Sequence, residues 1–96
     1  MTTMTHENVG TDTWTEVVTG HERAFVQLQS QGAVLLHIGS SAPADSSRVG
    51  LVLESGAVEE VAFDALEDGD SIYARSLGAG PAGVETLLVA QSGAFA

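Results

Sequence analysis

Histidine is the first residue type here that could do chemistry, because three histidines can in principle bind a metal ion. They are His6, His21 and His37. No two of them stand four residues apart, as zinc ligands on one helix face do, and the chain has no cysteine to supply a thiolate. His37 sits in an apolar stretch, where a histidine more often packs in a core or interface than binds metal. We therefore predict no metal site and no cofactor.

An acidic cluster offers a second possible cation site. Its members are Asp64, Glu67, Asp68 and Asp70. An EF-hand loop places oxygen ligands at alternate positions, then a glycine, then a distant glutamate, and this order breaks that pattern. The Asp-Gly pair at residues 68–69 is instead typical of a tight turn. The cluster predicts a solvated hairpin turn, with a weak surface Ca²⁺ or Na⁺ site as the alternative.

Catalytic motifs are missing from the sequence. No Gly-x-Ser-x-Gly elbow occurs among the serines. The glycine-rich residues 78–83 contain Pro81 and no lysine, which argues against a phosphate-binding loop. Paired carboxylates need a deep cleft for glycosidase chemistry, and a small chain with few aromatic residues rarely forms one. We predict that the protein is not an enzyme.

The charge balance excludes another class of partner. Thirteen acidic residues face three arginines and no lysine, which gives a net charge of −10. Phosphate backbones are bound by Lys and Arg, so we predict no nucleic-acid partner. No apolar run approaches the roughly 20 residues that cross a bilayer, and residues 1–7 lack the basic start and apolar stretch of a signal peptide. We expect a soluble protein, made in the cytoplasm of its host, with no membrane partner.

Short strand-like runs separated by turn residues recur from Trp14 onward. They cover residues 14–19, 23–29, 33–38, 48–54, 57–63, 71–77 and 84–91. This spacing predicts an all-β fold, a small antiparallel β-sandwich or barrel of about seven strands. Residues 14–96 would form this single domain. Residues 1–13 are polar and Thr-rich, and we expect a flexible N-terminal arm that is disordered or becomes ordered on assembly.

Three of these stretches are apolar on both faces of the expected strand. They are residues 33–38, 50–53 and 86–90. One sheet face of a small antiparallel domain normally meets water, so the surplus must be covered either inside the sandwich or by another subunit. Both arrangements remain open at this point. If a subunit covers it, the predicted assembly interface consists of apolar strand residues and two arm residues, namely Val34, Leu36, Ile38, Leu87, Val89, Thr5 and Val9.

The order of segments resembles small structural proteins of tailed bacteriophage virions. The residues that carry this resemblance are 14–17, 24–29, 34–43 and 70–76. It implies a capsid decoration (cement) protein, or the base domain of a head fibre. Such proteins commonly form homotrimers at three-fold positions on the capsid exterior, where they contact the major capsid protein and bridge neighbouring capsomers. The expected location is therefore the outside of the virion head.

Two alternatives share the expected fold. A carbohydrate- or receptor-binding module would use Trp14 and Tyr73 as exposed aromatic platforms, although both residues also suit core packing. Arg75 is expected on the same strand face as Tyr73 and would pair with a carboxylate. A neck or tail component would instead form rings of six or twelve subunits.

Overall fold

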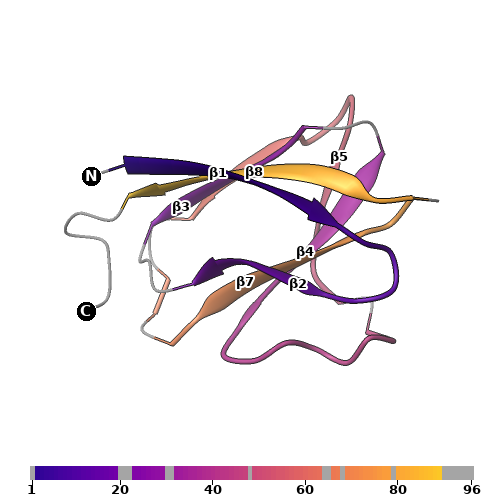
Figure 1. The fold of residues 1–96 in the computed structure, drawn as a ribbon, viewed down its shortest axis with the longest axis horizontal. Coiled ribbons are helices and arrows are strands. Elements are labelled where there is room, and N and C mark those ends of the chain that lie inside the picture. Colours follow the sequence, from indigo (N-terminus) through magenta and orange to yellow (C-terminus); the bar gives the residue numbers. More distant parts are fainter. Residues whose placement is uncertain are drawn as a thin grey trace.

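Two four-stranded antiparallel sheets form the computed structural model of the chain (Figure 1). The structure describes residues 2–19, 23–29, 32–47, 49–63, 66–67, 69–78 and 80–89, without the side chains of residues 2–4 and 86–89. Within these ranges the strands are β1 Thr2–Val9, β2 Thr15–Thr19, β3 Ala24–Leu28, β4 Ala33–Gly39, β5 Leu51–Glu54, β6 Glu60–Phe63, β7 Ser71–Ser76 and β8 Ala82–Val89. The predicted all-β sandwich is confirmed.

The strand order is that of a jelly roll. The first sheet has the order β1-β8-β3-β6 and the second has the order β2-β7-β4-β5. The first strand pairs with the eighth, the second with the seventh, the third with the sixth and the fourth with the fifth. This is the pairing of one long hairpin wrapped into two layers, which is how double-sheet jelly rolls are built.

Alternating side chains direct one face of each sheet to the interior. In β3, Ala24, Val26 and Leu28 are buried while the two residues between them are only partly so. Two-residue periodicity and a β-branched residue favour a strand here. The inner faces together form one core, whose buried members are Val9, Val17, Val18, Ala24, Val26, Leu28, Val34, Leu36, Leu53, Leu66, Ile72, Ala74, Ala82 and Val84.

Strand β7 departs from this alternation because all six of its residues are buried. Ile72 and Ala74 belong to the core between the sheets. Tyr73 and Arg75 alternate with them and therefore point to the outer face of the second sheet. Their burial requires a cover on that outer face, which the loops supply.

The N-terminal residues form a strand, so the prediction of a flexible arm is wrong. β1 pairs with β8 along its whole length, from Thr2 opposite Val89 to Val9 opposite Ala82. An edge strand needs only one buried face, and its threonines are β-branched residues that suit a sheet. Val9 is fully buried in the core. The seven strands predicted from Trp14 onward correspond to β2–β8, and β1 completes the same sandwich.

Candidate assembly surface along strand β5

Exposed apolar side chains gather around β5, the edge strand of the second sheet. Among the described residues, six large hydrophobic side chains are exposed, and four of them belong to this strand or lie just beyond its ends. They are Val49 at 74% exposure, Leu51 at 44%, Val52 at 46% and Val58 at 59%. Burying apolar surface gives about 25 cal/mol per Å², so such a group favours contact with another surface.

The main chain of β5 is paired on one side only. Beyond the end of the strand, the N–H of Ser55 donates to the carbonyl oxygen of Gly32 over 2.9 Å, toward β4. The direction of the main-chain N–H and C=O groups alternates from residue to residue along a strand, so the main-chain groups of Leu53 and Leu51 also point to β4. The N–H and C=O of Val52 therefore point to the open edge.

The outward main-chain groups of Glu54, two residues further along, already have hydrogen-bond partners within the chain. The N–H of Glu54 donates to the carbonyl oxygen of Val58 over 2.7 Å, and the carbonyl of Glu54 accepts from the N–H of Ala57 over 3.1 Å. Gly56 closes this turn with a φ of 82°, in the left-handed region that favours glycine. Within the described part of the chain, this leaves Val52 as the β5 residue whose outward main-chain groups have no partner.

Three predicted interface residues lie in the core instead. Val34, Leu36 and Val9 are at most 1% exposed. They point between the two sheets, so the prediction that they contact another subunit is wrong. The reason is that the inner faces of β4 and of β1 are each covered by the opposite sheet of the same chain.

The other predicted interface residues have different outcomes. Ile38 is 41% exposed, so it is available for a contact. Thr5 is partly buried on β1. The side chains of Leu87 and Val89 lie outside the described part of the structure. None of these residues belongs to β5, whose Leu51 and Val52 fall in the apolar stretch 50–53 that the sequence singles out.

A loop covers the outer face of the second sheet. Trp14, Leu35 and Tyr73 form a second buried cluster there. The indole N–H of Trp14 donates to the carbonyl oxygen of Ala44 over 3.1 Å. The ring of His37 lies near both aromatic rings, and its centre is 5.9 Å from that of Trp14 and 6.4 Å from that of Tyr73. Trp14 and Tyr73 therefore pack under the loop and are not open platforms for a sugar.

Arg75 is the buried cation of this outer layer, with 1% of its surface exposed. Its two terminal nitrogens donate to the carbonyl oxygens of Asp45 and Thr11. Its guanidinium carbon lies 5.5 Å from the centre of the Trp14 ring. The carboxylate partner expected from the sequence is wrong, because two main-chain oxygens take that place. The side chain thus ties two loops to β7.

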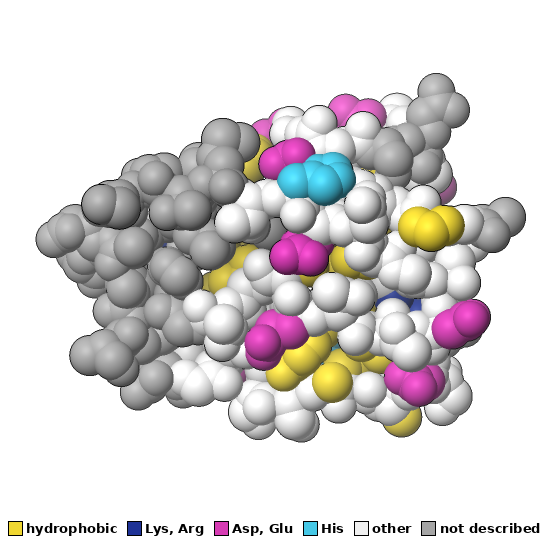
Figure 2. Space-filling model, in the orientation of Figure 1, with side chains coloured by type: hydrophobic (Ala, Val, Ile, Leu, Met, Phe, Trp, Pro, Cys, Tyr) yellow, Lys and Arg dark blue, Asp and Glu magenta, His cyan; other side chains and the backbone are white. Residues whose placement is uncertain are grey.

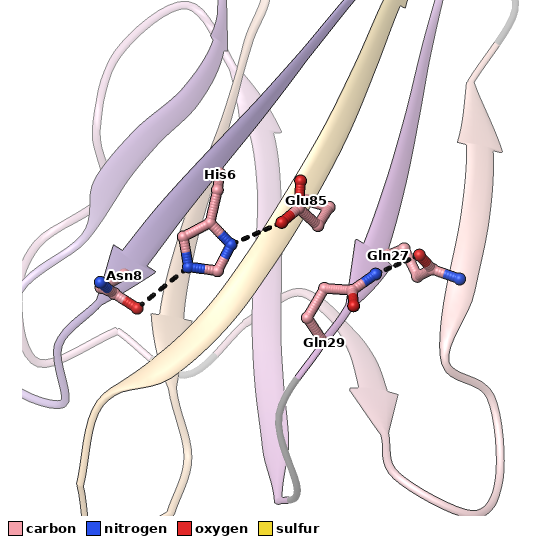
Figure 3. A network of polar contacts seen from close by, with 5 residues as sticks. All are labelled: His6, Asn8, Gln27, Gln29 and Glu85. Carbon is pink, nitrogen blue, oxygen red and sulfur yellow. Dashed lines mark hydrogen bonds and ion pairs between the residues drawn. The ribbon is translucent and has the colours of Figure 1, made fainter.

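On the outer face of the first sheet, polar side chains form a row (Figure 3). His6 Nδ1 lies 2.6 Å from Glu85 Oε1, and His6 Nε2 lies 3.3 Å from Asn8 Oδ1. The carboxylate of Glu85, which accepts a hydrogen bond from the ring, raises the pKa of His6. At the end of β3, the strand next to β8, the side-chain amide N–H of Gln29 donates to Oε1 of Gln27. Of these contacts, the one between His6 and Glu85 links the edge strand β1 to β8.

In the acidic turn around residues 67–70, the described hydrogen bonds are made to main-chain groups of the turn itself. The N–H of Asp70 donates to the carbonyl of Glu67 over 3.0 Å, and the N–H of Glu67 donates to Asp70 Oδ2 over 3.1 Å. Within the described ranges, no group of three or more His, Cys, Asp and Glu side chains is arranged to hold a metal ion. The remaining candidates, His21, Asp64 and Asp68, lie outside the described residues.

Figure 2 shows the face of the molecule that carries β1 and β2, where acidic side chains are spread among apolar ones. Comparison with protein-family models, curated proteins and solved structures found no match for this chain. In the described residues, no helix has the length and apolar character needed to span a membrane. The strand order and the surface around β5 are therefore the observations on which a function can be argued.

Proposed function

We propose that this protein is a structural component of a tailed-bacteriophage virion, a decoration protein that binds the outside of the head. The observation that carries the proposal is the jelly-roll strand order, with exposed apolar residues collected beside one edge strand. Jelly rolls recur in viral capsid proteins and in lectins. A fold alone does not decide between such functions, so the surface must.

The surface favours assembly over sugar binding. The two aromatic residues that could stack on a sugar, Trp14 and Tyr73, are buried under a loop. The exposed apolar residues are aliphatic and lie along β5, where they suit contact with another protein. The net charge of −10 suits an outer location, away from packaged DNA.

The proposed mechanism follows from a rigid subunit that exposes apolar residues along one strand edge. The two sheets and the loop held by Arg75 fix the shape of the subunit. Subunits would form a homotrimer, and each would contact the major capsid protein through the β5 surface. Many copies on one shell add avidity, so a modest affinity per contact would still bridge neighbouring capsomers.

Gold-labelled antibodies against this chain, applied to purified virions of the source phage, test the proposal. We expect label on the outside of the head and, for the isolated protein, the mass of a trimer. Label at the neck or tail, together with a six- or twelve-subunit mass, would favour the ring component instead. Virions that contain none of the chain would refute a structural role.

A further inference from the structure

Three of the four sheet edges carry features that oppose pairing with another chain. β1 presents His6 and Glu7, and β6 begins at Glu60. β2 has an irregular register between Glu16 and Val18. Charged side chains and bulges are the usual devices that keep an edge strand from adding a further strand.

β5 lacks such protection at its centre. Leu51, Val52 and Leu53 are consecutive and uncharged. Val52 directs its main-chain donor and acceptor outward without a partner in the described ranges. Val49 and Val58 extend the exposed apolar surface beyond the two ends of the strand. An incoming strand would therefore gain two main-chain hydrogen bonds and apolar contacts together.

The charges near this edge indicate the chemistry of the partner. Glu54 ends β5, and Glu59 and Glu60 follow the turn, and all three are exposed. Because the chain is strongly acidic and has no lysine, a second copy would bring like charges together. A segment with Lys or Arg beside apolar residues would bring opposite charges instead.

We propose that β5 accepts an extended, basic and apolar segment of a partner protein as an added strand of the second sheet. The residue opposite Val52 exchanges both main-chain hydrogen bonds with it. Side chains of the segment alternate between the two faces, so they contact Val52 on the outer face and Leu51 at the inner edge. The proposal follows from the β5 edge alone and does not depend on the virion assignment.

A short synthetic peptide of alternating valine and threonine, with a lysine at each end, tests the proposal on the full chain. We expect binding that protects the Val52 amide from hydrogen exchange and weakens with added salt. A matched peptide with glutamate in place of both lysines should bind about tenfold or more weakly, because charge attraction becomes repulsion. Equal binding of the two peptides would overturn the basic character of the partner.

Two proline variants locate the binding edge. Val52→Pro removes the outward N–H and should weaken binding of the lysine peptide by about tenfold or more. Ala62→Pro makes the same change on the edge strand β6 of the other sheet and should leave binding unchanged. Should Val52→Pro fail to fold, Val52→Lys places a charged side chain on the same edge and should block binding equally.

Other outcomes contradict the proposal clearly. If Ala62→Pro weakens binding as much as Val52→Pro, the peptide does not add to β5. If the chain forms dimers that Val52→Pro dissociates, the occupant of the edge is a second copy, and the proposed partner is wrong. No capsid enters this experiment, so its failure and a failure of the virion proposal can be told apart.

Discussion

Trp14 donates its indole N–H to the carbonyl oxygen of Ala44 over 3.1 Å, although 30 residues separate the two in sequence. This contact holds the connection between β4 and β5 against the outer face of the second sheet. Figure 1 shows the connection running along the lower side of that sheet. Leu35 and Tyr73 are buried beneath it. The sandwich therefore has a partial third layer, which covers strand faces that two layers would leave open.

Arg75 should be needed for that third layer. We expect Arg75→Ala to lower the free energy of unfolding by about 3 kcal/mol, because it removes two charge-assisted hydrogen bonds and leaves a cavity. Arg75→Lys should fall between the wild type and Arg75→Ala, since an ammonium cannot reproduce the planar fork that spans two carbonyls. Urea unfolding followed by the fluorescence of Trp14 measures both. An alanine variant as stable as the wild type would contradict the role assigned to Arg75.

Gly50 is predicted to tolerate no side chain. A Cβ atom built there would lie 2.2 Å from the carbonyl oxygen of Leu36, so the main chain would have to move. We expect Gly50→Ala to lower the free energy of unfolding by about 2 kcal/mol, as overpacking typically does. Gly10→Ala is the matched control, because a Cβ there meets no atom within 4 Å, and its effect should stay within about 0.5 kcal/mol. Thermal unfolding of the two variants in parallel decides the point.

Much of the fold could be predicted from local patterns. Alternating apolar residues such as Ala24, Val26 and Leu28, with turns between the runs, gave the seven strands β2–β8. β1 was missed because its polar, Thr-rich sequence has no alternation. Its pairing with β8 joins opposite ends of the chain, which no local pattern reveals.

The candidate site was harder to predict for the same reason. The apolar residues on both faces of 33–38 did need a cover, and the sequence left open whether that cover was internal. It is internal: the opposite sheet covers Leu36, and the loop around Ala44 covers Leu35. Which apolar strand stays open depends on the strand order, and this order places β5 at an edge. Leu51 and Val52 could thus be singled out as apolar but not as exposed.

The contact between His6 and Glu85 should make stability depend on pH. The hydrogen bond with the Glu85 carboxylate raises the pKa of His6 in the folded state above its usual 6.5. A raised pKa in the folded state stabilises the protein while pH is below the unfolded value, and this contribution is lost as pH rises through the folded value. The wild type should therefore exceed His6→Gln in stability more at about pH 5.5 than at about pH 9.

Urea midpoints of the wild type and His6→Gln at the two pH values measure this difference. We expect a small effect, because the side chains of His6 and Glu85 are 47% and 26% exposed to solvent. Glu85→Gln is the control, since it removes the carboxylate and should abolish the same pH dependence. A stability advantage that grows toward high pH would have the wrong sign for the contact.

Substitutions of Leu36 and Ile38 should have different effects, one on stability and the other on assembly. The two residues lie on the same strand face, two positions apart. Leu36 is 1% exposed, so Leu36→Ala should lower the free energy of unfolding by about 2–5 kcal/mol through the cavity it leaves. Ile38 is 41% exposed, so Ile38→Ala should cost about 1 kcal/mol or less. If the exposed side chain of Ile38 takes part in the proposed trimer contact, Ile38→Ala should still weaken self-association, measured by analytical ultracentrifugation of the folded variant. Leu36→Ala should therefore lower stability strongly, whereas Ile38→Ala should lower self-association and leave stability nearly unchanged. A large loss of stability in Ile38→Ala would show that Ile38 is a core residue and would contradict this prediction.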